Sequence, residues 1–225
     1  MLHGSEHPEL ADGVLRAIYP YVAKGDAEAT HLISRWFANY ASVQTTPTVT
    51  RNLDRNDSTD EHSLILFGSA SSNRFIRNLM HAHEDLPITL ETRTRVSVSA
   101  PLTPQEQQQI ADLEKKGAFR VVPAERGCIL DFSSGTYWPA ILTRLPNPHI
   151  TDIPTTVFNT DFGMAVCALA AILTNEPRLR RSFERLELPE APEYFQFLYC
   201  VEARNHGPKQ VVEPIAWFGY KPRGI

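Results

Sequence analysis

The chain has 225 residues, a net charge of −4 and an isoelectric point near 6.1, so it has no overall basic field to attract nucleic acid or anionic lipid. Its 42% hydrophobic and 21% charged content is typical of a globular protein with a real core. No apolar run is long enough to span a bilayer, and residues 1–13 lack the apolar segment of a secretory signal. The three cysteines form no C-x-x-C pair, which favours free thiols and a cytoplasmic location.

Two amphipathic helices are predicted within residues 8–41, and we expect residues 1–50 to form a helical N-terminal extension. Asp26 can cap the second helix, which carries a wide apolar stripe. Because that stripe must pack on the sheet or on a second copy of the chain, we expect a homodimer formed through Trp36, Phe37 and Tyr40. A helix-turn-helix that binds DNA is disfavoured, since Arg35 is the only basic residue on the second helix.

Residues 63–80 organise the rest of the chain, after a polar joint over residues 42–62. The unbroken apolar run before Gly68 is typical of a strand buried on both faces, and a helical pattern resumes at Phe75. Between them lies a loop of small residues whose side chains carry hydrogen-bond donors. This loop lacks the sequence pattern of a phosphate loop or of a dinucleotide-binding turn. Either the loop is a turn capped by Ser71 or Ser72, or it binds a ligand at the start of the helix. The candidate ligand-binding residues here are Gly68, Ser69, Ser71, Ser72 and Asn73.

His81, His83 and Glu84 follow this helix, but histidines two residues apart do not share a helix face. We therefore predict a solvated helix end and no metal site. Residues 87–100 alternate in polarity and predict one strand, bent or broken into two. Residues 103–106 then have the composition of a capping box, which starts a helix that runs to about Lys116 and precedes a short strand over residues 118–122.

Small polar residues follow another short apolar segment, over residues 128–131, which is predicted as a strand. Because residues 137–145 resume as a strand, this segment is predicted either as a hairpin turn or as a second polar wall of the pocket. In the second case Asp131 would accept a hydrogen bond from a ligand hydroxyl, and Ser133 would line the wall.

A second junction of strand, polar turn and helix is predicted over residues 155–173. Its helix, residues 164–173, is apolar nearly all round and is therefore central, with Thr160 or Asp161 as its cap. If both junctions belong to one parallel sheet, their helix N-termini lie along one edge, which predicts a pocket there. The candidate ligand-binding residues at this junction are Asn159, Thr160 and Asp161.

The expected fold is α/β, with a mixed, mostly parallel, Rossmann-like sheet and helices on both faces over residues 60–225. An arginine-rich helix follows residue 175 and presents a solvated face. Strands over residues 193–204 and 211–220 close the sheet as a C-terminal β-hairpin.

Three functions remain open. The first is a sensor or regulatory domain that binds a nucleotide or another small anionic molecule. The second is a hydrolase acting on a glycosidic or phosphoester bond in the same pocket, with Asp131 and Asp161 as candidates for acid and base. The third is a dimeric interaction protein without a small ligand. No catalytic residue, cofactor, metal, membrane or nucleic-acid partner is assigned.

Overall fold

The computed structural model describes residues 4–5, 21–22, 24–39, 63–71, 73–83, 85–147, 154–185, 193–203 and 212–219. The predicted first helix, Tyr40, Ser72 and Glu84 lie outside these ranges. The described elements, in chain order, are β1 (Gly4–Ser5), β2 (Tyr21–Val22), α1 (Lys24–Phe37), β3 (Leu64–Gly68), α2 (Arg74–Ala82), β4 (Ile88–Thr92), β5 (Arg95–Val98), α3 (Pro104–Lys115), β6 (Arg120–Pro123), β7 (Cys128–Asp131), β8 (Tyr137–Pro146), β9 (Pro154–Asn159), α4 (Gly163–Leu173), α5 (Glu176–Arg185), β10 (Phe195–Glu202) and β11 (Val212–Gly219).

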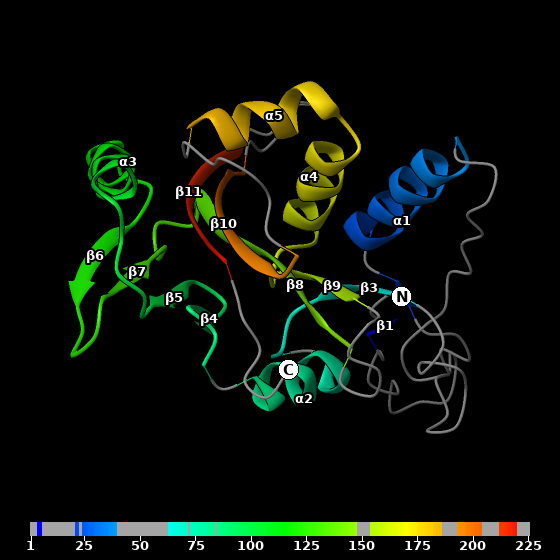
Figure 1. Ribbon diagram of the computed structural model, residues 1–225, viewed down its shortest axis with the longest axis horizontal. Helices are drawn as coiled ribbons and strands as arrows, with labels where there is room; N and C mark the ends of the chain where they lie inside the picture. Colours follow the sequence, from blue (N-terminus) through cyan, green and yellow to red (C-terminus); the bar gives the residue numbers. More distant parts are fainter. Residues whose placement is uncertain are drawn as a thin grey trace, which may run out of the picture.

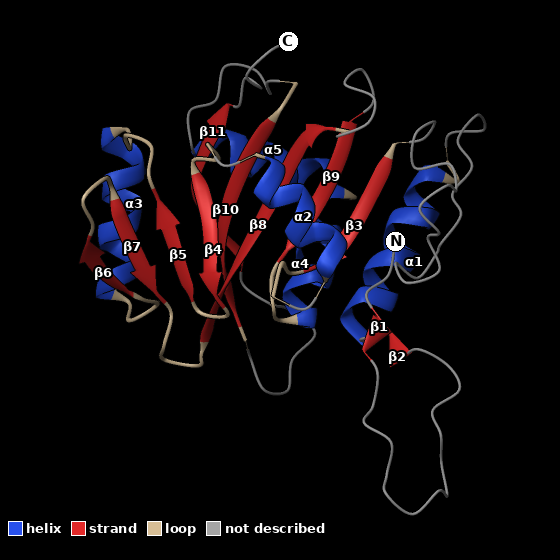
Figure 2. Ribbon diagram, turned by 90° about the horizontal axis from the view of Figure 1, so that it is seen from below, coloured by secondary structure: helices blue, strands red, loops and turns tan. Residues whose placement is uncertain are grey.

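A five-stranded sheet forms the centre of the described structure, in the order β11-β10-β8-β9-β3 (Figure 2). Its only parallel pair is β3 with β9, and the other neighbours run antiparallel. β10 and β11 form the expected C-terminal hairpin, with β11 at the edge. A four-stranded sheet, β4-β5-β7-β6, is antiparallel throughout, and β1 pairs with β2.

The prediction of a mostly parallel, Rossmann-like sheet is wrong. Alternating strand and helix patterns predict crossovers between parallel neighbours, but residues 88–131 leave the central sheet and build the second one. β8 then returns between β9 and β10 and pairs with both in the antiparallel sense. The fold is α/β with two mostly antiparallel sheets, because a helix between two strands can pack on a sheet without joining parallel neighbours.

The central sheet is covered on both faces (Figures 1 and 2). α4 and α5 lie on one face, where α1 packs against α4. The opposite face carries α2, and the second sheet with α3 also packs against it. Neighbouring residues of one strand therefore serve different cores: Leu66 packs beneath α2, whereas Phe67 packs beneath α4. This burial on both faces explains the unbroken apolar run of β3.

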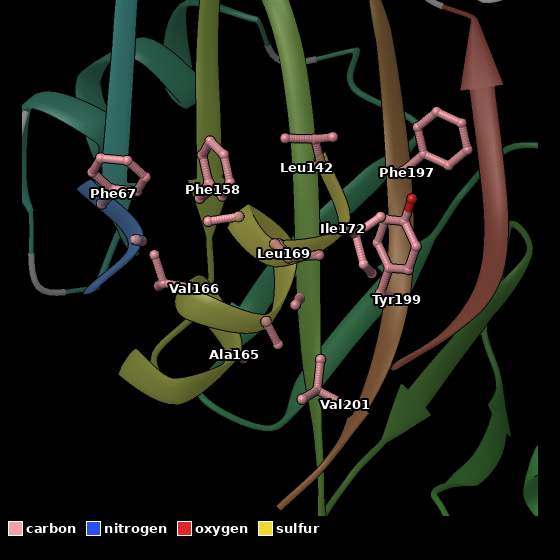
Figure 3. Close-up of a cluster of buried hydrophobic side chains, with 14 of the residues drawn as sticks. Phe67, Leu142, Phe158, Ala165, Val166, Leu169, Ile172, Phe197, Tyr199 and Val201 are labelled. Atoms are coloured by element: carbon pink, nitrogen blue, oxygen red, sulfur yellow. The ribbon is translucent and has the colours of Figure 1, made fainter. Parts of the chain in front are cut away.

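The core beneath α4 is dense in aromatic and aliphatic side chains (Figure 3). Val166, Leu169 and Ile172 project from α4 toward the sheet, which supplies Phe67, Leu142, Phe158, Phe197, Tyr199 and Val201. Ala29 and Ile33 of α1 belong to the same core. Much of the α1 stripe therefore packs within its own chain, with Phe37 partly buried against this core. Self-association through Trp36 and Phe37 stays a prediction.

A buried amide joins the two sheets. The side chain of Gln196 on β10 accepts a hydrogen bond from the Ile88 N–H at 2.7 Å and donates to the Ile88 carbonyl at 3.0 Å. Its nitrogen also lies 3.2 Å from the Thr143 hydroxyl. Gln196 thus pairs with β4 as a neighbouring strand would, and it fixes β4 beside the central sheet. This matters for function because β4 forms one wall of the cleft described below.

Asp26 is buried in the first turn of α1, and it gives the first testable prediction. Its exposed fraction is 2%, and burial raises its pKa from 3.8 to about 6. Because the folded-state pKa is raised, the stability that the protonated form contributes is present below pH 4 and is lost as pH rises through 6. The pKa change corresponds to about 3 kcal/mol. We expect Asp26→Asn to unfold at a higher temperature than the unmodified chain at pH 8, and this advantage to vanish near pH 4.

Melting curves at pH 4, 6 and 8 measure this effect. The control is Asp112→Asn, which removes a half-exposed carboxylate from α3 and should change stability by less than about 0.5 kcal/mol at each pH. A difference between Asp26→Asn and the unmodified chain that stays constant from pH 4 to pH 8 would contradict the assignment of a titrating, buried carboxyl.

Candidate functional site

The loop after β3 begins at a residue that must be glycine. Gly68 has φ = +115°, a conformation that residues with a side chain rarely adopt. α2 begins after Asn73, whose Oδ1 accepts hydrogen bonds from the N–H groups of Phe75 at 3.0 Å and Ile76 at 3.3 Å. The prediction that Ser71 or Ser72 caps this helix is therefore wrong. Asn73 is the cap, and it uses two of the N–H groups that a bound anion would need.

The second junction lies directly beside the first. β3 and β9 run parallel, with Gly68 opposite Asn159, so both strands end at the same edge of the central sheet. This adjacency confirms the prediction that the two junctions lie along the same edge of the sheet. Thr160 holds them together: its N–H donates to the Gly68 carbonyl at 3.3 Å, and its hydroxyl donates to the Pro139 carbonyl on β8 at 2.8 Å.

The expected cap of α4 is also corrected. Phe162 occupies the N-cap position and makes no side-chain capping hydrogen bond. Thr160 accepts a hydrogen bond from the Phe162 N–H at 3.3 Å, one position before the helix, and Asp161 points elsewhere. Neither Thr160 nor Asp161 is the cap. The Asp161 side chain instead contacts the first junction.

Asp161 connects the two junctions through the serines of the Gly68 loop. Its Oδ1 accepts hydrogen bonds from the hydroxyls of Ser69 and of Ser71, the latter at 2.5 Å. The two serine hydroxyl oxygens lie 2.8 Å apart. Ser69 is fully buried, whereas Ser71 is exposed. The sequence thus predicted a cluster of donors, but these donors bind a carboxylate of the same chain.

Arg77 supports the loop from α2. Its Nε donates to the Ala70 carbonyl at 2.8 Å, and a terminal nitrogen donates to the Ser71 carbonyl at 3.0 Å. These contacts hold the guanidinium of Arg77, which lies in the first turn of α2, against the loop. Sequence analysis did not single out Arg77, because nothing in the helical pattern distinguishes it from a solvated arginine.

A cleft of about 510 Å³ opens beside this cluster. α2 forms one wall, β4 forms another, and the ends of β3 and β9 form the floor. Its volume lies within the range usual for small-molecule sites. The residues that line the cleft are Ala70, Ser71, Arg77, Met80, His81, His83, Leu86, Ile88, Thr89, Leu90, Glu91, Thr92, Asn159 and Asp161.

Two buried acceptor atoms of cleft-lining residues have no hydrogen-bond partner among the described residues. They are Oδ1 of Asn159 and Oδ2 of Asp161. Asn159 is 4% exposed, so an unsatisfied amide oxygen there carries a desolvation cost of about 1–3 kcal/mol. Both atoms have almost no accessible surface, so neither oxygen faces the open cleft.

The charges of the cleft are mixed. Glu91 and Asp161 supply carboxylates, and Arg77, His81 and His83 lie on or just beyond α2. Burial lowers the pKa of the His83 imidazole below 6.5, and the Asp85 carboxyl opposes this shift. His83 is therefore mainly neutral at pH 7. The described residues contain no cluster of three or more His, Cys, Asp or Glu side chains that would hold a metal ion.

Of the predicted site residues, Ser71, Asn159 and Asp161 line the cleft, whereas Gly68, Ser69, Asn73 and Thr160 lie at the two junctions without lining it. Asp131 and Ser133 lie away from both junctions. Asp131 ends β7 in the second sheet, where its carboxylate lies 3.2 Å from the guanidinium of Arg120. Ser133 is exposed in the turn before β8. Neither lines the cleft. The β4 wall, including Ile88 and Glu91, escaped sequence analysis because its position depends on the distant contact with Gln196.

Comparisons with known proteins found no matching family model, no similar curated protein and no similar solved structure. No helix of the described residues has the length and apolarity needed to cross a membrane. The geometry of the cleft therefore carries the functional argument.

Proposed function

We propose that this protein is a small-molecule-binding domain that acts as a sensor or regulatory module. The ligand occupies the cleft between α2, β4 and the ends of β3 and β9. The observation that carries this proposal is the cleft itself, which has a volume of about 510 Å³ and is lined by apolar side chains together with the polar side chains of Arg77, Asn159 and Asp161.

The anionic ligand expected from the sequence fits this cleft less well than an uncharged one. Asp161 brings a negative charge to the loop, and Asn73 already occupies N–H groups at the start of α2. An anion at the loop would therefore meet a carboxylate and few free backbone donors.

A hydrolase is the second candidate, and one observation favours it. Glu91 and Asp161 are two carboxylates that line the same cleft, as acid–base catalysis requires. This pair replaces the Asp131 and Asp161 pair suggested by the sequence, since Asp131 belongs to the second sheet. Mass spectrometry of the ligand after incubation with the protein distinguishes the two functions. A sensor leaves the ligand unchanged, whereas a hydrolase cleaves it. In the second case, the Glu91→Gln variant should form no cleavage products.

A thermal-shift screen of nucleosides, nucleotides, sugars and polyamines tests the binding proposal. Thr89 is exposed on β4 and lines the cleft, so Thr89→Trp should fill the site and weaken the binding of any true ligand at least about tenfold. Thr136→Trp is the matched control, because it makes the same change at an exposed position outside the cleft. A screen in which no hit depends on Thr89 would reject the proposal.

Two further assignments belong with this proposal. Cytoplasmic location is supported by Cys128 and Cys200, whose buried thiols form no disulfide. A homodimer through the N-terminal region is supported by Trp36, whose ring packs edge-on against Phe37 while the side chain stays half-buried. Sedimentation over a range of protein concentrations measures whether the dimer forms.

A further inference from the structure

One edge of the second sheet opens into the cleft. β4 is an outermost strand of that sheet, and β4 and α2 lie side by side over the same face of the central sheet (Figures 1 and 2). All the residues of β4, from Ile88 to Thr92, line the cleft. Since successive side chains of a strand point to opposite faces of its sheet, a wall made of consecutive residues is the edge of the strand, with its backbone.

The backbone groups of β4 alternate between its two sides. The Ser99 N–H donates to the Pro87 carbonyl at 2.9 Å, so this carbonyl faces β5. Both backbone groups of Ile88 bind the side chain of Gln196, on the other side. The pairing of β4 with β5 is regular from Ile88 to Leu90. Because every second residue of an antiparallel pair turns its N–H and C=O away from the partner strand, those of Leu90 point to the outer edge, as those of Ile88 do.

The contact with Gln196 shows the chemistry that this edge accepts. The side-chain amide of Gln196 has the donor and the acceptor of a peptide group, and it makes with Ile88 the two hydrogen bonds that a neighbouring strand would make. Leu90 lies about 7 Å farther along β4. Among the described residues, its backbone has no hydrogen bond from outside the β4–β5 pair. The edge is thus paired at one position and open at the next.

The wall opposite this edge is a helix face. Arg77, Met80 and His81 are spaced three and four residues apart, so they share one face of α2, and all of them line the cleft. Met80 is half-buried, and the buried Leu86 adds a second apolar side chain between α2 and β4. The cleft therefore combines a strand edge, which can pair with backbone groups, with a helix face, which can contact side chains.

The length of the open edge limits the size of the ligand. The pairing of β4 with β5 is irregular between Leu90 and Thr92, and such a bulge bends the strand and interrupts its ladder. Only a short segment of added strand can therefore pair with β4. The cleft volume of about 510 Å³ is likewise that of a small ligand. A residue of an extended chain offers one donor and one acceptor at the spacing that the two groups of Leu90 require.

We propose that the cleft binds a short peptide in extended conformation, which adds to β4 as a further strand and exchanges both backbone hydrogen bonds with Leu90. This inference rests on the proposed function and names the ligand class for the same site. Because the backbone supplies the pairing, affinity depends on which amide nitrogens of the peptide carry a hydrogen, and the apolar side chains of Met80 and Leu86 favour peptides with an apolar residue.

Selection of a displayed library of random seven-residue peptides against the full chain supplies the probes. The tightest peptide is synthesised with both ends blocked and is N-methylated at one residue at a time. N-methylation removes one donor, and the N–H groups of an extended strand alternate in direction. By calorimetry, we expect methylation of a residue that pairs with β4 to weaken binding at least about tenfold, and methylation of its neighbours to weaken it less than about threefold.

Hydrogen exchange of the chain's own amides locates the contact. In the free protein the Leu90 amide should exchange at least about tenfold faster than the amides of Ile88 and Thr89, which are bound to Gln196 and to β5. The selected peptide should slow exchange at Leu90 at least about tenfold. The amides of β6, at the other edge of the same sheet, are the control and should not change.

Four results would overturn the inference: no library peptide binds, N-methylation has no alternating effect, the Leu90 amide is as protected as that of Thr89 in the free protein, or Thr89→Trp leaves the affinity of the selected peptide unchanged. If no peptide binds but a hit of the thermal-shift screen binds in a manner that Thr89→Trp blocks, the ligand class is wrong and the proposed function stands. If Thr89→Trp weakens neither a peptide nor any hit, the proposed function fails as well.

Discussion

Leu169→Asp is expected to abolish cooperative folding. Leu169 is 1% exposed on α4 and lies over the central sheet between Val166 and Ile172 (Figure 3). Removal of a buried leucine side chain alone costs about 2–5 kcal/mol, and an unpaired carboxylate in the same place adds several more. A domain is stable by only about 5–15 kcal/mol, so the variant should lose a sharp unfolding transition in urea and collect in the insoluble fraction.

Met164→Asp is the matched control on the same helix. Met164 is 36% exposed in the first turn of α4, where a carboxylate meets the positive end of the helix dipole. This variant should remain soluble and unfold within about 1 kcal/mol of the unmodified chain. If Leu169→Asp unfolds as cooperatively as Met164→Asp, then α4 does not pack against the sheet as described.

The local elements were predictable because their signals lie within short stretches of chain. Residues 103–106 carry the capping box that starts α3, and its reciprocal hydrogen bonds are present. The apolar run before Gly68 and the all-round apolar helix at residues 164–173 are both found in the core. In each case one segment's composition determines whether it is helix or strand and whether it is buried.

Strand order was not predictable in the same way, because it depends on contacts between distant residues. β8 pairs with β9 and β10 by backbone hydrogen bonds. The residues of β8 themselves do not indicate which strands it pairs with, or whether the pairing is parallel or antiparallel. The second sheet likewise depends on Gln196, which binds Ile88 across 108 positions of sequence. No pattern within residues 88–131 indicates that these strands leave the central sheet.

The candidate site was predictable in part for the same reason. Asn159 and Asp161 are candidates from the sequence because they lie at the end of a buried strand, and the parallel pairing of β3 with β9 brings this strand end beside the loop that carries Ser69 and Ser71. Asp131 satisfied the same sequence rule, but it ends a strand of the other sheet. The rule that ligands bind at strand ends therefore identifies candidate site residues. Which of these residues share one site depends on the sheet to which each strand belongs.

Glu106→Ala is expected to destabilise the chain by about 3–5 kcal/mol, because it removes a buried carboxylate with three hydrogen bonds. Oε2 of Glu106 accepts from the Thr103 N–H at 2.7 Å and from the Thr103 hydroxyl at 2.9 Å. Oε1 accepts from the Trp217 N–H at 3.0 Å. One side chain, 1% exposed, thus caps α3 and joins it to the edge strand β11.

Urea unfolding monitored by tryptophan fluorescence measures this loss, with Glu114→Ala as the matched control. Glu114 lies on the same helix and accepts one backbone hydrogen bond, from the Val121 N–H at 2.8 Å, but it is exposed. Its loss should cost only about 0.5–1 kcal/mol, since water replaces the missing acceptor. Glu106→Gln should fall between the two variants, because an amide keeps only one of the two acceptor oxygens. Equal losses in Glu106→Ala and Glu114→Ala would mean that burial of the carboxylate adds nothing, and that α3 is held to β11 by its apolar contacts alone.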